Sequence, residues 1–239
     1  GVATLLQLKR TPLTGIGLPV VLGCAVQAVT PLETIGGKLG ITYMYGAIIA
    51  AGIFVFLIAG FFARLKKFFP PVVTGSLITI IGFTLVPVGF QDLGGGTPTA
   101  ASFGDPANLL IGFLTIAIIL LFNAFARGFM KSIAILLGIL ISSFIAGALG
   151  FVSLKAGSEA AWFHTPQLFF FGVPRFDMSA MITMILVSLT TMIESTGVFF
   201  ALSDITGRQL TTNDLERGYR AEGIAAILGG LFNTFPYST

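Results

Sequence analysis

Long stretches without a charged residue limit what this chain can fold into. A helix that crosses a bilayer takes about 20 predominantly apolar residues. Backbone groups exposed to lipid must bond within their own segment, so such stretches favour membrane helices over open sheets. Four uncharged apolar stretches reach this length: residues 41–63, 68–90, 106–126 and 132–154.

Three further segments are apolar but less regular. Residues 178–203 contain one carboxylate, Glu194, and a last apolar run begins at Gly223. Residues 11–32 are uncharged but hold several prolines and glycines, which break or weaken a helix. We therefore expect an all-α polytopic membrane protein in which residues 11–32 do not form one ordinary helix.

The composition excludes the main soluble classes. Hydrophobic residues make up 55% of the 239 residues and charged residues only 10%, whereas soluble domains carry about 25% charge. Disorder is excluded too, because it requires low hydrophobicity and high charge. Enzyme motifs and metal-ligand spacings are missing, and Cys24 is the single cysteine. We expect no enzyme, no catalytic residue, no metal and no cofactor.

The basic residues indicate the orientation in the membrane. The formal net charge of +3 comes from Lys and Arg in short loops, which is a topology signal and not evidence of nucleic-acid binding. Loops 64–67, 127–131 and 204–222 hold most of these residues and alternate with poorly basic loops. We expect these three loops in the cytoplasm and the loop 155–177 on the extracellular or periplasmic side, with the lipid bilayer between them.

Glu194 is the most informative single residue. It is the only charged residue in the run 178–203. A carboxylate at membrane depth costs at least ~2.5 kcal/mol on insertion scales, and such residues mark transport sites or proton relays. Small and hydroxyl residues surround it, and Thr191, Glu194 and Ser195 share one helix face. The alternative is a structural carboxylate paired with another helix.

Two other features are compatible with a transport site. The proline-bounded segment 19–31 resembles a discontinuous helix, which transporters use to present backbone groups to a substrate. Gln27 within it adds a neutral donor and acceptor, although a kinked ordinary helix fits equally well. Glu222 directly precedes the last apolar run. At the N-terminus of a helix it would be stabilised by the helix dipole, and its role would then be purely structural.

These blocks together resemble the nucleobase/ascorbate transporter family, also called nucleobase–cation symporter family 2. Residues 192–197 and 203–207 are similar to the family's eighth transmembrane segment. Residues 220–239 resemble the ninth segment and the approach to the tenth, and residues 22–31 resemble the third. The spacing of these blocks fits along the whole chain, from the end of segment two to the start of segment ten.

The resemblance implies a fold of two inverted repeats of seven helices, of which this chain would be a fragment. The third segment would be a half-helix with a short strand. Residues 1–67 and 178–239 would belong to the core domain, and residues 68–154 to the gate domain. Residues 155–177 would form the outer loop, and the full-length protein would form a homodimer through its gate domain.

The resemblance also implies a function and a site. Glu194 would hydrogen-bond a purine nucleobase and carry the coupled proton, and Ala28 and its neighbours would offer backbone groups. Gln27 and Glu222 complete the expected substrate site. Val198 stands where the uracil permease has a histidine, which favours xanthine or uric acid as substrate. We expect a secondary active transporter of the plasma membrane, coupled to protons or to sodium ions, that works by alternating access.

Two alternatives stay open at this point. A sulfate-type anion transporter of the same fold is the first, although a carboxylate such as Glu194 opposes an anion unless it is protonated. A non-functional fragment is the second, because the family's signature at the start of segment ten would lie just past Thr239. Neither alternative predicts a nucleic-acid partner.

Overall fold

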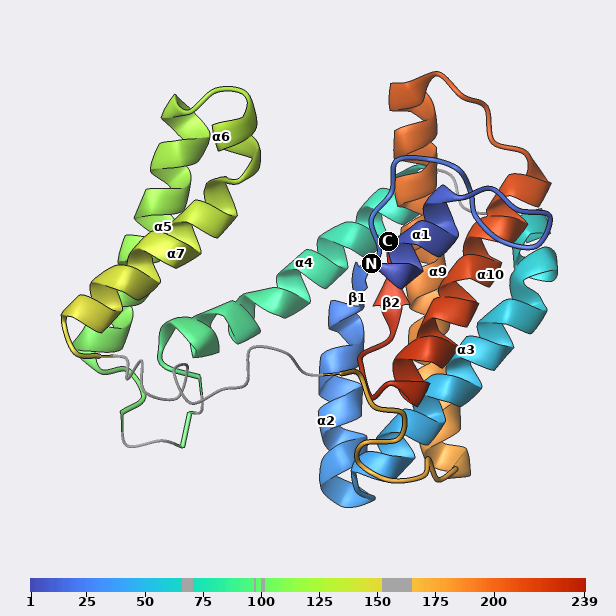
Figure 1. Cartoon of the computed structure of the whole chain (residues 1–239), viewed down its shortest axis with the longest axis horizontal. Coiled ribbons are helices and arrows are strands. Elements are labelled where there is room, and N and C mark those ends of the chain that lie inside the picture. Colours follow the sequence, from blue (N-terminus) through green and yellow to red (C-terminus); the bar gives the residue numbers. More distant parts are fainter. Residues whose placement is uncertain (66–70, 97, 100–101, 152–164) are drawn as a thin grey trace. The chain divides into compact units, whose positions relative to one another are not determined.

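The computed structural model describes residues 1–65, 71–96, 98–99, 102–151 and 165–239. The chain forms two compact units, Gly1–Ile81 with Thr165–Thr239, and Gly82–His164. Lys66 and Lys67 of the first basic loop lie outside the described residues, as do residues 155–164 of the predicted loop 155–177. The mainly helical architecture with long apolar helices confirms the predicted fold class (Figure 1). The assignment of core and gate domains stays a prediction.

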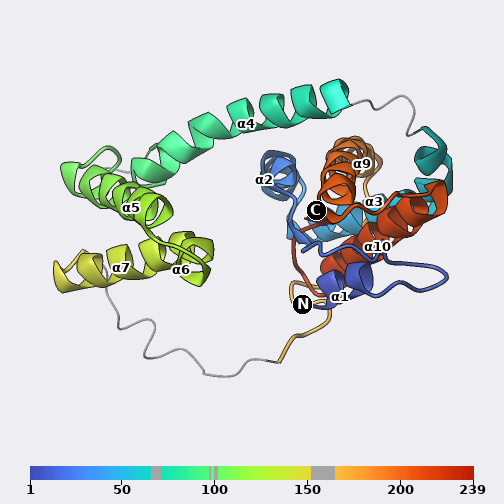
Figure 2. The same ribbon diagram turned by 90° about the horizontal axis from the view of Figure 1, so that it is seen from above.

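The first unit holds most of the elements. Helix α3 packs against both α10 and α9, and the short helix α2 lies beside α9 (Figure 2). The elements of this unit are α1 (Val2–Leu8), β1 (Gly23–Cys24), the 3-10 turn η1 (Val26–Ala28), α2 (Val29–Lys38), α3 (Ile41–Arg64), α9 (Met178–Thr206), α10 (Thr212–Leu231) and β2 (Tyr237–Ser238).

The second unit is a helical hairpin. Helix α5 (Pro106–Phe125) packs on α7 (Ala134–Ala148), with the short helix α6 (Phe129–Ser132) between them. Their close contact needs Gly138, because a Cβ there would lie 2.2 Å from Cγ1 of Ile119. Helix α4 (Pro71–Leu93) begins in the first unit and ends in the second.

Local sequence signals explain where the long helices begin and end. The Asp177 side chain caps α9 by accepting a bond from the backbone N–H of Ala180, and Gly207 ends it in a left-handed conformation with φ of 66°. Thr211 and Asp214 form a reciprocal capping box at the start of α10. The predicted loop 204–222 is therefore mostly helical, with five residues between the two helices.

One expectation about α10 is wrong. This helix begins at Thr212, so Glu222 lies in its interior and not at an N-terminus. The capping box starts the helix well before the apolar run, through a charged first turn that hydropathy alone does not identify as helical. The helix dipole therefore does not explain Glu222.

The segment 11–32 is broken, as predicted. It contains an extended stretch, β1 and η1 before α2 begins at Val29. Strand β1 pairs antiparallel with β2, with Gly23 opposite Ser238 and Cys24 opposite Tyr237. The backbone N–H of Ala25 continues the contact by donating to the carbonyl of Pro236 at 2.9 Å. The predicted half-helix with a short strand is thereby confirmed.

A cluster of charges anchors the extended stretch at the other end of the unit. Asp214 is 2% exposed and lies 2.6 Å from an Arg10 nitrogen and 3.5 Å from an Arg208 nitrogen. Arg208 also donates to the carbonyl of Gly17 at 2.8 Å. Burial raises the pKa of Asp214, but the hydrogen bonds from Thr211 and the two guanidinium charges outweigh it and leave the pKa lowered.

The contact between α3 and α10 predicts the effect of adding a methyl group there. A Cβ at Gly52 would lie 2.8 Å from the carbonyl oxygen of Gly223. We expect Gly52→Ala to destabilise the protein by about 1–3 kcal/mol, since overpacking forces the backbones apart. Thermal unfolding in detergent measures this. Gly37→Ala is the control, because a Cβ at Gly37 meets nothing within 4 Å; equal Tm values for the two variants would contradict the prediction.

The charge cluster predicts a pH dependence of stability. Because the folded-state pKa of Asp214 is lowered, its contribution is fully present above the unfolded-state pKa of about 3.9 and is lost as the pH falls through the folded-state pKa. Asp214→Asn should lower stability at neutral pH by about 1–2 kcal/mol. Thermal melts across pH should show the gap to wild type closing below that range. Exposed Asp204→Asn serves as the control, and a gap that is constant with pH would sink the prediction.

Candidate functional site

Two of the predicted site residues meet directly. The side-chain amide of Gln27, in η1, donates a hydrogen bond to Oε2 of Glu194, in the middle of α9. The two residues are 167 positions apart in the sequence. Both side chains are partly exposed, so the pair can be reached from outside the packed helices. The broken segment thus brings a neutral amide to the membrane-depth carboxylate.

Ala28 lies next to this pair, and its backbone N–H is already bonded. It is fully buried, and its N–H donates to the carbonyl of Ala25 at 3.1 Å within the 3-10 turn. The role of Ala28 and its neighbours in offering backbone groups to a ligand stays a prediction. Strands β1 and β2 lie immediately beside it and fix the position of the turn.

Glu222 lies deeper than Glu194. It is 4% exposed, and its Oε1 accepts a hydrogen bond from the Thr239 hydroxyl at 3.0 Å. Among the described residues it takes part in no ion pair. A buried carboxyl held by a hydroxyl, without a cation, is stable only as long as its charge is compensated or absent.

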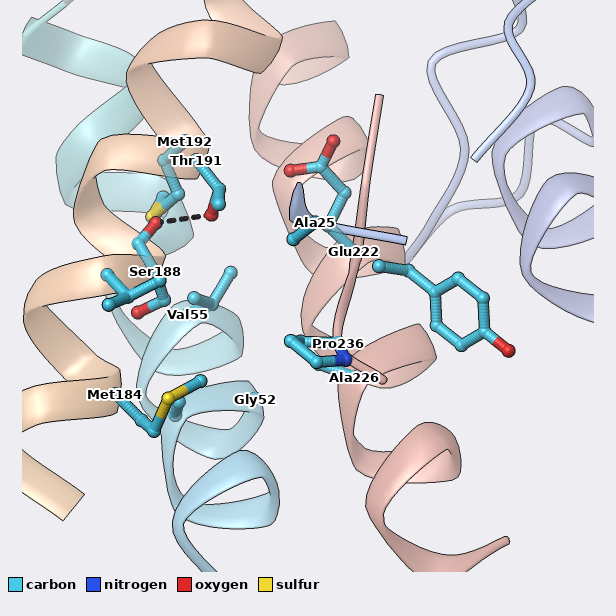
Figure 3. A pocket seen from close by; sticks show the side chains of 13 residues that line it. Ala25, Gly52, Val55, Met184, Ser188, Thr191, Met192, Glu222, Ala226 and Pro236 are labelled. Carbon is cyan, nitrogen blue, oxygen red and sulfur yellow. Dashed lines mark hydrogen bonds between the residues drawn. The ribbon is translucent and has the colours of Figure 1, made fainter. Parts of the chain in front are cut away.

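Glu222 lines a small cavity between α3, α9 and α10 (Figure 3). Met184, Ser188 and Thr191 line it from α9, and Gly52 lines it from α3. The Thr191 hydroxyl donates to the Ser188 carbonyl at 2.8 Å, so its lone pairs remain available. The cavity volume is about 20 Å³, which is room for about one water molecule.

The predicted residues therefore fall into two neighbouring groups. Gln27 and Glu194 form a partly exposed polar pair between η1 and α9, and Glu194 does not line the small cavity. Glu222 and Thr239 form a buried pair next to β2. The strand pair β1–β2 connects the two groups along the chain. Strand β1 comes just before η1, which holds Gln27, and β2 comes directly before Thr239.

Sequence reasoning missed two polar groups, Ser188 in the lining of the cavity and Thr239 beside Glu222. Ser188 could have been found, because it precedes Thr191 by three positions and Ser195 by seven, which places all three on one helix face. No sequence signal pairs Thr239 with Glu222. Among the described residues, no group of three or more His, Cys, Asp or Glu could hold a metal ion.

Comparison with known proteins gives a consistent answer. A model of the Permease family matches residues 1–239. The chain is 53% identical to the uric acid permease PucK and 52% identical to the xanthine permease of Bacillus subtilis strain 168. Both alignments cover 100% of this chain, but only 55% and 54% of those proteins. It is also 38% identical to the uric acid transporter UacT of Escherichia coli K12, over 50% of that protein.

The chain thus spans about half the length of these curated relatives. In the part that the structure describes, three helices are long and apolar enough to cross a membrane: Ile41–Arg64, Pro106–Phe125 and Met178–Thr206. This agrees with a multi-pass membrane protein, and the relatives are permeases and not enzymes, as the sequence predicts. With a family model matching from end to end, the chain belongs to the permease family.

Proposed function

We propose that the protein takes part in secondary active transport of an oxopurine, xanthine or uric acid. The observation that carries the proposal is the hydrogen-bonded pair of Gln27 and Glu194 beside a broken membrane segment. The names of the relatives, uric acid permease and xanthine permease, support the same substrates. Transporters commonly bind substrate where such discontinuous segments meet.

The chemistry of the pair suits a flat heterocycle. A carboxylate accepts hydrogen bonds from ring N–H groups, and an amide both donates and accepts. Glu194 accepts a bond from Gln27 in the structure. A purine that binds here would exchange this internal bond for bonds to its own ring edge. Ala28 and its neighbours would offer backbone groups of the turn to the purine. Glu222 would support the site indirectly, because it binds the hydroxyl of Thr239, the residue after β2.

The proposal includes proton coupling at Glu194. A partly exposed carboxylate at membrane depth can exchange a proton with water while it remains beside low-dielectric surroundings. A proton gradient would then drive uptake, and a sodium gradient is the alternative drive. Alternating access would move the core domain, residues 1–67 and 178–239, against the gate domain, residues 68–154. We further propose a plasma-membrane homodimer with loops 64–67, 127–131 and 204–222 in the cytoplasm.

Glu194→Gln tests the carboxylate. In the protein expressed at its full natural length, we expect uptake of labelled xanthine and urate to fall more than about 100-fold, because charge-assisted binding and proton exchange are both lost. Membrane insertion should be unchanged. Glu33→Gln, an exposed carboxylate on α2, is the control and should transport normally. Normal xanthine uptake by Glu194→Gln in proteoliposomes would remove Glu194 from the mechanism.

Gln27→Met tests the amide separately. It keeps the length of the side chain but removes the amide, which in the proposal leaves Glu194 to bond the ring edge of the purine. We expect the KM for xanthine to rise roughly 10-fold, since hydrogen bonds to charged groups are worth about 1.5–3 kcal/mol. Initial-rate uptake measures this. Competition by excess sulfate in the same assay distinguishes an anion carrier, and strong inhibition by sulfate but not by purines would overturn the proposed substrate class.

A further inference from the structure

A groove runs along α2 and the start of α9. Its volume is about 620 Å³, within the range of small-molecule sites. Helix α2 lines it with Thr30, Thr34 and Lys38, and the start of α9 lines it with Ser179 and Thr183. The side chains of Ile35 and Leu39 add an apolar wall. The lining of the groove thus combines apolar and polar side chains.

The polar groups follow one line on each helix. Thr30, Thr34 and Lys38 are spaced four residues apart, and Ser179 and Thr183 repeat the same step. The Thr34 hydroxyl donates to the carbonyl of Thr30 at 2.9 Å, and the Thr183 hydroxyl donates to that of Ser179 at 2.8 Å. Their protons are used within the helices, so both hydroxyls present lone pairs that can accept hydrogen bonds.

The groove also contains one available cation. Lys38 is exposed and forms no ion pair within the described part of the chain. Asp177 lines the same groove, but its carboxylate already caps α9 by accepting from the N–H of Ala180 at 3.0 Å. An incoming ligand therefore meets a free ammonium group and a carboxylate that is already bonded.

The two polar lines lead to the pair of Gln27 and Glu194. Thr183 and Glu194 are eleven positions apart, which is roughly 16 Å along α9 at a rise of 1.5 Å per residue. Gln27 lies in η1, directly before the start of α2 at Val29. The steps from Thr183 through Thr190 to Glu194 keep to one face of α9. On α9, the groove therefore lies on the same helix face as Glu194 of the proposed binding site.

We propose that this groove is a first docking subsite for the oxopurine, where Lys38 binds a carbonyl oxygen or the anionic edge of urate. The hydroxyls of Thr34 and Thr183 accept from ring N–H groups, and the apolar wall packs against the flat face of the ring. The ligand then passes along the two helices to Glu194. This inference rests on the proposed function, and it assigns a residue, Lys38, that the binding site itself does not use.

Lys38→Met removes the ammonium group and keeps the aliphatic stem. In the full natural-length protein, we expect the KM for labelled urate to rise roughly 2- to 10-fold at unchanged maximal rate, the effect of one lost hydrogen bond. Lys38→Arg should keep the wild-type KM. Lys9→Met removes an exposed lysine at the other end of the unit and is the control for net charge. Raising the salt concentration should raise the wild-type KM but not that of Lys38→Met.

Three results would overturn the docking subsite. If Lys38→Met keeps the wild-type KM while Glu194→Gln abolishes uptake, the groove is not used and the proposed function stands. If Lys38→Met changes only the maximal rate, Lys38 acts in the conformational cycle and not in docking. If the wild-type protein takes up neither urate nor xanthine, the proposed function fails and the subsite fails with it. Thr34→Val, which removes a hydroxyl without a charge, should also raise the KM.

Discussion

The whole arrangement depends on satisfying the backbone of one broken segment. Residues between α1 and α2 do not form an α-helix, so most of their N–H and C=O groups need partners elsewhere, and lipid offers none. Strand β2 supplies them for Gly23 and Cys24, and Pro236 supplies one for Ala25. This pairing holds η1 in place, and η1 is what brings Gln27 to Glu194. A regular helix through the same residues would pair its own backbone N–H and C=O groups and would leave no fixed turn at that depth.

The remainder of the first unit keeps that turn rigid. Glycine at Gly52 and Gly223 lets α3 and α10 approach until a Cβ would meet the opposite carbonyl at 2.8 Å. At the other end, Arg208 joins Gly17 of the extended stretch to Asp214 of α10. The broken segment is therefore fixed at both ends to α10 or to the chain that follows it. If Gln27 and Glu194 bind the substrate as proposed, they require a fixed frame of this kind.

The sequence predicts the parts whose signals are local. Uncharged runs identified the apolar helices, and prolines and glycines identified the broken segment. Glu194 was singled out because one carboxylate interrupts an apolar run. Hydropathy did not reveal that Glu222 lies inside α10, since the first turns of that helix are charged and start from a capping box. The contact between Gln27 and Glu194 and that between Thr239 and Glu222 depend on the tertiary path of the chain, which local patterns do not encode.

The surroundings of the two carboxyl groups assign them different parts in the proposed mechanism. Glu222 faces a cavity with room for about one water molecule, so a purine cannot reach it there without the helices separating. Glu194 is partly exposed, its partner is a neutral amide, and the groove lined by Lys38 opens on the same face of α9. In the proposed mechanism, ligand and proton therefore reach Glu194 first. Glu222 would have a supporting part, because its bond to Thr239 holds the residue that follows β2.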